Sequence, residues 1–225
     1  MTLIDYPGRL ACTVFLVGCN FKCPFCYSPE LVIPQKIKNQ PRISEADFFN
    51  FLKERKELLE GVVICGGEPT IHKDLASLIK KIKKMGFLVK LDTNGSNPQM
   101  LEKLIKDGLI DYVAMDIKAP KEKYHKLTGK KINVNNIEKS IKILKGSGID
   151  YEFRTTVIPG LLDKKDILKI ARWIGPGGRY YLQNFKGEKT IDSNFEKVKP
   201  YPADYLFEVK KTILPLFDIC EVRGI

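Results

Sequence analysis

The chain has 225 residues, of which 44% are hydrophobic, and its formal net charge is +11. This length and apolar content allow one domain with a sizeable core and make two equal domains the weaker expectation. No stretch approaches the roughly 20 uninterrupted apolar residues of a membrane span. The apolar residues 10–18 are too few for one and follow no basic leader. We therefore expect a soluble, cytoplasmic protein without a membrane partner.

The positive charge is compatible with nucleic acid, an acidic partner protein or an anionic cofactor, because charge balance governs association rather than fold. The lysines are scattered along expected helices with Glu and Asp nearby, which is typical of solvated helix faces. Three of the six cysteines lie within eight residues. That clustering indicates metal or redox chemistry in a reducing compartment rather than a disulfide framework.

Apolar, β-branched runs separated by helix-length segments predict six strands. They lie at residues 11–17, 61–65, 87–92, 110–116, 150–157 and 179–185. Between them, Ser44 followed by Asp47 resembles a capping box, and Asn97-Pro98 places proline at a first helical position. Alternating strands and helices imply a parallel sheet with right-handed crossovers.

Six such units can curl into a three-quarter barrel whose site lies at the carboxyl ends of the strands. We predict an α/β fold, a partial (βα)6 barrel, in a single domain over residues 1–225. The barrel would cover about 10–185 and a C-terminal extension about 186–225, in which residues 217–222 add a last strand. The long irregular segments 27–42 and 186–202 are candidates for function.

A cysteine triplet directly follows the first predicted strand. Cys19, Cys23 and Cys26 form a C-x3-C-x2-C pattern on a loop where a barrel keeps its chemistry. Three thiolates on a tight loop can each bind one iron of a cubane cluster and leave the fourth iron open to a chelating substrate. The triplet therefore predicts a [4Fe–4S] site.

Structural zinc is the alternative for the triplet. A zinc site commonly has four ligands, and only Cys12, Cys65 or His72 could complete this one. Cys12 and Cys65 lie within apolar strands, and Cys220 lies in the terminal strand, where free cysteines usually behave as small buried hydrophobes.

The triplet, together with Gly66-Gly67-Glu68-Pro69 after the second strand, resembles the radical S-adenosylmethionine (SAM) superfamily and its barrel. Four further motifs resemble glycyl-radical-enzyme activases, especially the anaerobic ribonucleoside-triphosphate reductase activating proteins: Asp5-Tyr6-Pro7-Gly8, Phe15-Leu16-Val17-Gly18-Cys19-Asn20, Asp92-Thr93-Asn94-Gly95 and Met115-Asp116-Ile117-Lys118. The likeness spans nearly the whole chain. Tyr27 departs from it, because these activases often carry His after the third cysteine.

The resemblance implies that the cluster cleaves SAM to a 5′-deoxyadenosyl radical with one external electron. It also implies that the backbone of Gly66 and Gly67 accepts from the methionyl ammonium, with Glu68 adding negative charge. Absent side chains let a backbone approach a ligand closely. The alternative for this motif is a simple turn that ends a strand.

Asp92 and Asp116 close two neighbouring strands, so their carboxylates should converge at the barrel mouth, where burial demands a cation or hydrogen-bond donors. The resemblance to activases implies a monovalent cation beside the sulfonium. Its ligands would be Asp92, Thr93, the backbone carbonyl of Met115 and Asp116. Capping of a helix or loop by either aspartate is the alternative.

Lys118 and Arg154 are expected to face the same mouth, where either could pair with the methionyl carboxylate or act as an ordinary ion-pair partner. Gln183 and Asn184 end the sixth strand and could hydrogen-bond substrate or adenosine. Val157-Ile158-Pro159-Gly160 resembles the superfamily's adenine-contacting stretch, although core packing explains it almost as well.

Three functions remain open. The first is a glycyl-radical activase, whose partners would be a glycyl radical enzyme such as anaerobic ribonucleotide reductase and an electron donor such as flavodoxin or ferredoxin. The second is a radical SAM enzyme that modifies RNA or a small metabolite. The net charge of +11 keeps RNA open as a substrate. The third is a non-catalytic metalloprotein. A broad apolar mouth would favour the first, and an aromatic-lined basic groove would favour RNA.

Overall fold

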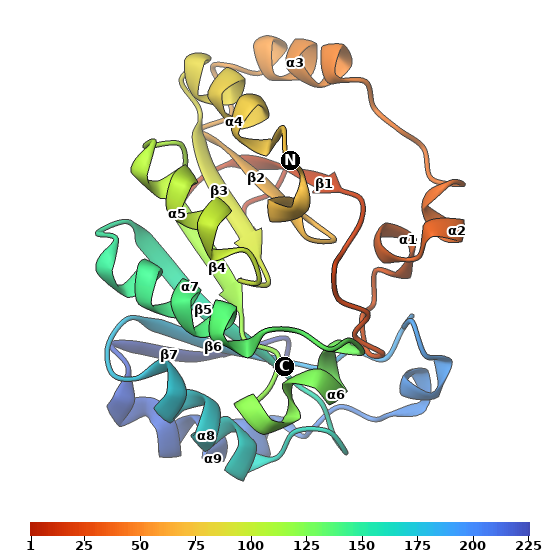
Figure 1. The fold of residues 1–225 in the computed structure, drawn as a ribbon, viewed down its shortest axis with the longest axis vertical. Coiled ribbons are helices and arrows are strands. Elements are labelled where there is room, and N and C mark those ends of the chain that lie inside the picture. Colours follow the sequence, from red (N-terminus) through yellow and green to blue (C-terminus); the bar gives the residue numbers. More distant parts are fainter.

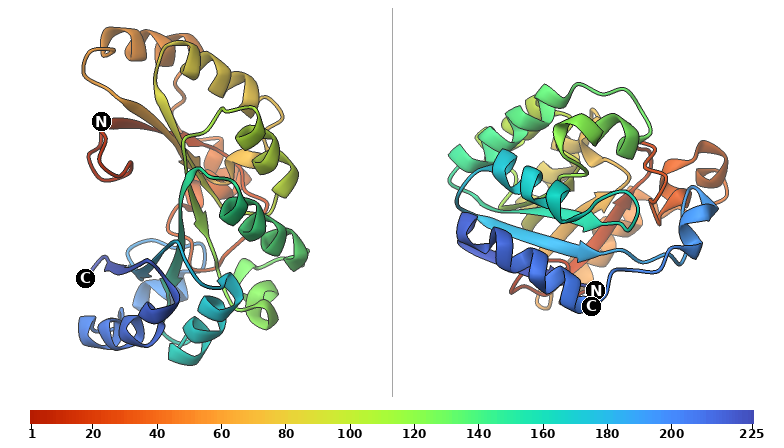
Figure 2. Two further views of the ribbon diagram at one scale, coloured as in Figure 1. Left: turned by 90° about the vertical axis from the view of Figure 1, so that its left-hand side faces the viewer. Right: turned by 90° about the horizontal axis from the view of Figure 1, so that it is seen from below.

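Seven parallel strands form one sheet in the order of the chain, from β1 to β7, in the computed structural model of residues 1–225. The strands are β1 (Ala11–Leu16), β2 (Gly61–Gly66), β3 (Leu88–Thr93), β4 (Tyr112–Asp116), β5 (Asp150–Val157), β6 (Arg179–Asn184) and β7 (Ile219–Arg223). The sheet is curved and stays open between β1 and β7, so the molecule is a crescent with both termini on its open side (Figure 2).

Helices cover the outer, convex face of the sheet (Figure 1). The main ones are α3 (Glu45–Glu54), α4 (Leu75–Lys84), α5 (Pro98–Lys106), α7 (Val134–Gly146), α8 (Lys164–Ile174) and α9 (Ala203–Ile213). Shorter pieces are α1 (Pro29–Val32), α2 (Pro34–Ile37), α6 (Tyr124–Thr128) and the 3₁₀ turns η1 (Pro69–Ile71), η2 (Lys121–Lys123), η3 (Ser193–Lys197) and η4 (Leu214–Leu216). None of these helices is both long and apolar enough to cross a membrane.

Local signals in the sequence explain where the helices begin. The Ser44 side chain accepts from the Asp47 amide ahead of α3, and Asn97 does the same for Met100 with Pro98 at the first turn of α5. Between the helices and the outer face of the sheet lies a cluster of 43 buried residues. The six predicted strands are confirmed to within two residues at each end.

The sheet does not end with the sixth strand. β7 pairs in parallel with β6 and begins two residues later than the strand expected at 217–222. Helix α9 buries Leu206, Val209 and Ile213. The segment after residue 185 therefore supplies the helix of the sixth βα unit and, as predicted, a last strand.

The amino end of the crescent is closed by the start of the chain. Thr2 forms an antiparallel bridge with Ala11, and Tyr6 packs in a small buried cluster with Val63 and Tyr112. Asp5 lies next to this plug and accepts a 3.0 Å hydrogen bond from the Thr13 hydroxyl. The start of the chain therefore covers the amino ends of β1, β2 and β4.

If α9 belongs to the same core, Ile213→Ala should lower the free energy of unfolding by about 2–5 kcal/mol, the range for a fully buried aliphatic side chain. Lys211→Ala, which changes an exposed position two residues away, is the matched control and should stay within about 0.5 kcal/mol. Urea unfolding measures both. A loss below about 1 kcal/mol for Ile213→Ala would show that the last 40 residues (186–225) pack loosely on the barrel.

Candidate active site

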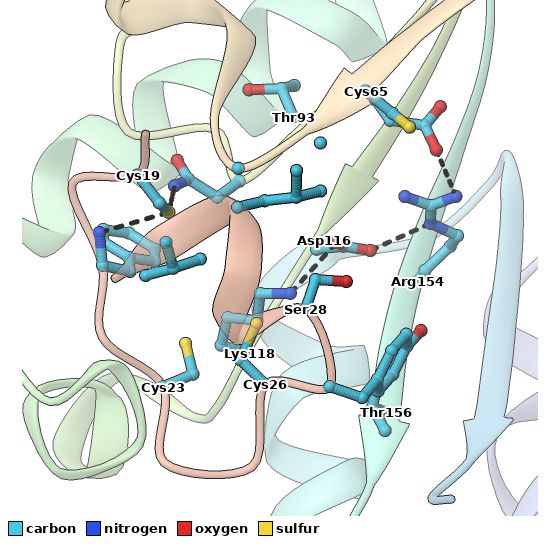
Figure 3. Close-up of a pocket in the computed structure, with 18 of the residues that line it drawn as sticks. Cys19, Cys23, Cys26, Ser28, Cys65, Thr93, Asp116, Lys118, Arg154 and Thr156 are labelled. Carbon is cyan, nitrogen blue, oxygen red and sulfur yellow. Dashed lines mark hydrogen bonds and ion pairs between the residues drawn. The ribbon is translucent and has the colours of Figure 1, made fainter. Parts of the chain in front are cut away.

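The three cysteines lie on one loop at the carboxyl end of β1 and line one pocket of about 320 Å³ (Figure 3). Backbone hydrogen bonds fasten this loop on several sides: Gly18 N to Leu31 O, Lys22 N to Thr128 O, Ile191 N to Cys26 O and Asp192 N to Pro24 O. The last two come from segment 186–202, whose length predicted a functional loop. That segment braces the cysteine loop from outside (Figure 1).

Aromatic side chains between the cysteines anchor the loop to the core. Phe21 and Phe25 are buried, and Phe21 meets Tyr124 edge-on at 6.5 Å. The sulfur atoms of Cys19 and Cys26 are left half-buried towards the pocket. Without metal, burial raises the pKa of the Cys19 thiol to about 11 and that of Cys23 to about 12, although Lys118 opposes the shift at both.

The donor set fits an iron–sulfur cluster better than a structural zinc. Of the three candidates for a fourth zinc ligand, Cys12 is buried in the core and His72 bonds the Val17 carbonyl at 2.9 Å. Neither lines the pocket. Cys65 does so, but from the end of β2 on the side of Arg154 rather than from the cysteine loop (Figure 3). Three thiols on one loop are the set that leaves one iron of a cubane free.

Gly66 and Gly67 let the end of β2 lie directly against the cysteine loop. Gly67 N donates to Leu16 O and Glu68 N donates to Gly18 O, both at 2.8 Å. Gly66 has a φ of +118°, and a Cβ at Gly67 would overlap the Gly18 carbonyl group. Both glycines also line the pocket, so close packing within the chain is a second reason for them beside contact with a ligand.

Glu68 lies behind the pocket rather than in it, which differs from the expectation that its charge faces SAM. Its side chain is fully buried and accepts hydrogen bonds from the Thr70 amide and hydroxyl, the Thr93 hydroxyl and the Asn94 amide at 2.5–3.0 Å. Burial raises the pKa of Glu68 while these donors oppose the shift. The carboxylate thus joins the ends of β2 and β3.

Asn94 continues this connection to the cysteines. Its side-chain nitrogen Nδ2 donates to the Asn20 side-chain oxygen at 2.9 Å and lies 4.0 Å from the Cys19 sulfur. Asn20 in turn donates to the Ser96 hydroxyl at 2.7 Å. Neither asparagine had a predicted role, although Asn20 and Asn94 both lie inside motifs that resemble those of activases.

Asp92 and Asp116 converge at the mouth, as their strand positions predicted, and Arg154 lies between them (Figure 3). Arg154 Nη1 contacts Asp92 Oδ2 and Arg154 Nε contacts Asp116 Oδ1, each at 2.9 Å. Lys118 Nζ lies 3.0 Å from Asp116 Oδ2, and Lys90 pairs with Asp92 Oδ1. Neither aspartate caps a helix.

Lys90 was not among the residues predicted for the site. It precedes Asp92 by two residues in β3 and therefore projects from the same face of the sheet, a signal that was readable. Its side chain is 3% exposed. Pocket residues without a predicted role include Asp5, Phe15, Tyr27, Ser28 and Thr156.

Of the remaining residues predicted for the site, some line the pocket and others do not. Gln183 and Thr93 line the pocket, but Asn184 does not and donates instead to the Tyr201 carbonyl at 2.9 Å. Val157 and Ile158 are fully buried and lie outside the pocket lining, which favours the core-packing alternative for that stretch.

An α/β crescent with three thiols at the carboxyl end of its first strand is the architecture of a metal-cluster enzyme. Sequence comparison identifies the superfamily to which it belongs. The profile of the radical SAM superfamily matches residues 13–174. The chain belongs to the radical SAM superfamily, whose members use a [4Fe–4S] cluster and SAM. The Methanocaldococcus jannaschii protein named "Putative glycyl-radical enzyme activating enzyme MJ1227" is 34% identical over 100% of this chain and 93% of its own.

A second relative and a solved structure are also similar to this chain. The pyruvate formate-lyase-activating enzyme of Streptococcus mutans is 28% identical over 76% of this chain and 68% of its own. The crystal structure of Streptococcus suis SuiB bound to S-adenosylmethionine superposes with a TM-score of 0.71 at 17% identity, covering 96% of this chain and 51% of that one. The chain thus spans about half the length of SuiB, and this likeness shows the fold alone.

If the three loop cysteines hold the cluster, Cys23→Ser should lose iron and sulfide after anaerobic reconstitution, because only two ligands remain. Cys65→Ser is the matched control, since it removes a thiol from the same pocket and should keep the cluster. Iron and sulfide per chain measure both. Full iron retention by Cys23→Ser, or tight zinc binding that needs Cys65, would contradict the assignment.

The charges at the mouth also predict a pH dependence of stability. Burial would raise the pKa of Asp116, but Arg154 and Lys118 outweigh it and lower the pKa to about 2. Since the unfolded pKa is about 3.9, this stabilisation is complete above that pH and disappears as the pH falls towards 2. Wild-type protein should lose more stability between pH 5 and pH 3 than Asp116→Asn does, by about 1 kcal/mol in urea unfolding. Equal losses would contradict the pairing.

Proposed function

We propose that this chain activates a glycyl radical enzyme by abstracting a backbone hydrogen atom from a glycine of that partner. The observation that carries the proposal is the full-length similarity to the Methanocaldococcus jannaschii relative, at 34% identity, together with the shorter match to a pyruvate formate-lyase-activating enzyme. The resemblance noted in the sequence makes anaerobic ribonucleotide reductase the first partner to test.

The lining of the mouth supports a peptide substrate over a nucleic acid. Its charged side chains are three acidic and two basic, and both basic ones are paired with aspartates. Phe15 and Tyr27, which are 60% and 55% exposed, add apolar surface. A groove for RNA would need unpaired positive charge. A flexible glycine-containing loop needs apolar contact and an open side, and the crescent offers both.

When bound, a [4Fe–4S] cluster would supply the electron that cleaves SAM to methionine and a hydrogen-abstracting 5′-deoxyadenosyl radical. Cys19, Cys23 and Cys26 would hold the cluster, and the backbone at Gly66 and Gly67 would accept from the methionyl ammonium. Lys118 is the better partner for the methionyl carboxylate, because Arg154 is committed to two aspartates while Lys118 contacts only one.

The other pocket side chains orient the nucleoside end and the substrate. Gln183 and Thr156 present polar groups from β6 and β5, and Thr93 closes the pocket beside Asp92. The protein's part is to aim the reactive carbon at one hydrogen and to exclude other donors. The electron would come from a flavodoxin or ferredoxin.

A small nucleotide is the second candidate substrate. The probable GTP 3′,8-cyclase of Thermococcus kodakarensis is 28% identical over 70% of this chain, although that match covers only 51% of the relative. Polar groups such as Gln183 and Ser28 in the pocket could serve a nucleotide as well as a peptide.

The deciding measurement is anaerobic electron paramagnetic resonance on the reduced, reconstituted protein mixed with SAM and the glycyl radical enzymes of the same genome. We expect a persistent glycyl doublet on one partner, absent without SAM and absent with Cys23→Ser. Partner capture should tighten when SAM is present, because the loop must be ordered against an occupied site. No doublet with any partner, together with 5′-deoxyadenosine formation stimulated by a nucleotide or RNA, would overturn the proposal.

A further inference from the structure

The two aspartates at the mouth have no oxygen that lacks a side-chain partner. Asp92 Oδ1 is bonded by Lys90 and Asp92 Oδ2 by Arg154, while Asp116 Oδ1 is bonded by Arg154 and Asp116 Oδ2 by Lys118. All four carboxylate oxygens therefore have a cationic side-chain partner. The resemblance to activases had implied that these oxygens coordinate a monovalent cation.

The other two groups implied for that cation are not available at the mouth either. The Thr93 hydroxyl donates to Glu68 at 2.7 Å and accepts from Gly95 N at 3.1 Å. Met115, implied through its backbone carbonyl, is fully buried in β4 and is not part of the pocket lining. The chain's own contacts thus do not fit an exchangeable cation at this position.

The charge balance points the same way. Lys90, Lys118 and Arg154 face Asp92 and Asp116, and Asp5 lines the same pocket, so the charged side chains of the mouth already balance. A further cation would add positive charge next to a sulfonium that is itself positive, in a partly desolvated site where such repulsion is strong.

Arg154 is suited to replace an ion because its guanidinium is planar, permanently charged and able to bridge two carboxylates at once. Its side chain is 12% exposed, and its pKa is raised well above the usual value because Asp116 and Asp92 outweigh the effect of burial. Removing it would leave two buried carboxylates facing one another, with one cationic partner each.

We propose that Arg154 is the built-in counter-cation of this SAM site and acts as a positioning residue that holds Asp92 and Asp116 together, so that SAM cleavage needs no exchangeable monovalent cation. This inference rests on membership of the radical SAM superfamily and not on the identity of the final substrate. It is therefore tested through SAM cleavage itself, with dithionite as reductant and no partner enzyme present.

The first experiment uses the reconstituted wild-type protein in potassium, sodium, lithium or choline chloride at equal ionic strength. We expect the rate of 5′-deoxyadenosine formation to vary by less than twofold among the four salts. A loss of tenfold or more in choline that potassium or sodium restores would overturn the proposal. Cluster content is measured in each salt, so that loss of iron is not mistaken for loss of a bound cation.

The second experiment replaces the guanidinium. Arg154→Gln should create a cation requirement, with at least tenfold slower cleavage in choline and partial rescue by sodium or potassium, and Arg154→Lys should fall between it and wild type. Arg179→Gln is the matched control, because Arg179 lies in β6 and pairs with Asp150 outside the site. The control should behave as wild type in every salt.

Sodium-23 nuclear magnetic resonance supplies a readout independent of activity. Arg154→Gln should broaden the sodium line in a way that potassium reverses, whereas wild type and Arg179→Gln should not. Specific broadening by wild type, or an Arg154→Gln protein that cleaves SAM at the wild-type rate in choline, would overturn the proposal. If Arg154→Gln does not fold, the wild-type rates and line widths alone decide.

Discussion

The contact between the ends of β1 and β2 is the constraint on which the site depends. Two backbone hydrogen bonds, from Gly67 to Leu16 and from Glu68 to Gly18, hold the cysteine loop against the next strand. They form because a Cβ is absent from both Gly66, where it would overlap Leu16, and Gly67, where it would overlap Gly18. The same turn brings the Glu68 carboxylate under the end of β3, where it accepts from Thr93 and Asn94. The chain's own contacts thereby fix the cysteine loop relative to the ends of β2 and β3.

The interior of the crescent is polar, unlike the aliphatic core of a closed eight-stranded barrel. The interior contains two layers of charged side chains. In the layer nearer Tyr6, the Glu152 carboxylate accepts hydrogen bonds from Arg223 and from the Tyr112 hydroxyl. The upper layer is the Asp92–Arg154–Asp116 bridge. Each buried charge in these layers has a partner of opposite sign, as burial requires. The opening between β1 and β7 keeps this inner face available to substrate instead of filling it with side chains.

How much the sequence could predict depends on the range of the interaction. Strands, caps and the cysteine loop follow from local period and spacing, and they were confirmed. That Asp92 and Asp116 meet could be predicted, because strand ends of a parallel sheet share one rim. That Arg154 satisfies both could not, because each of its two contacts depends on how residues 38 and 62 positions away are turned. Glu68 was misplaced for the same reason, since its four donors come from two separate segments.

The distribution of charge bears on what the chain meets. The net charge is +11, yet the mouth is lined by three acidic and two basic side chains. The excess positive charge therefore lies outside the mouth, where lysines such as Lys80, Lys84 and Lys139 are exposed on the outer helices. Charge so placed does not select the group that reacts, but it raises the rate at which a large acidic surface approaches. A protein partner that covers the open side of the crescent would contact the nearly neutral, partly apolar mouth, whereas the lysines of the outer helices would act on its approach only at a distance.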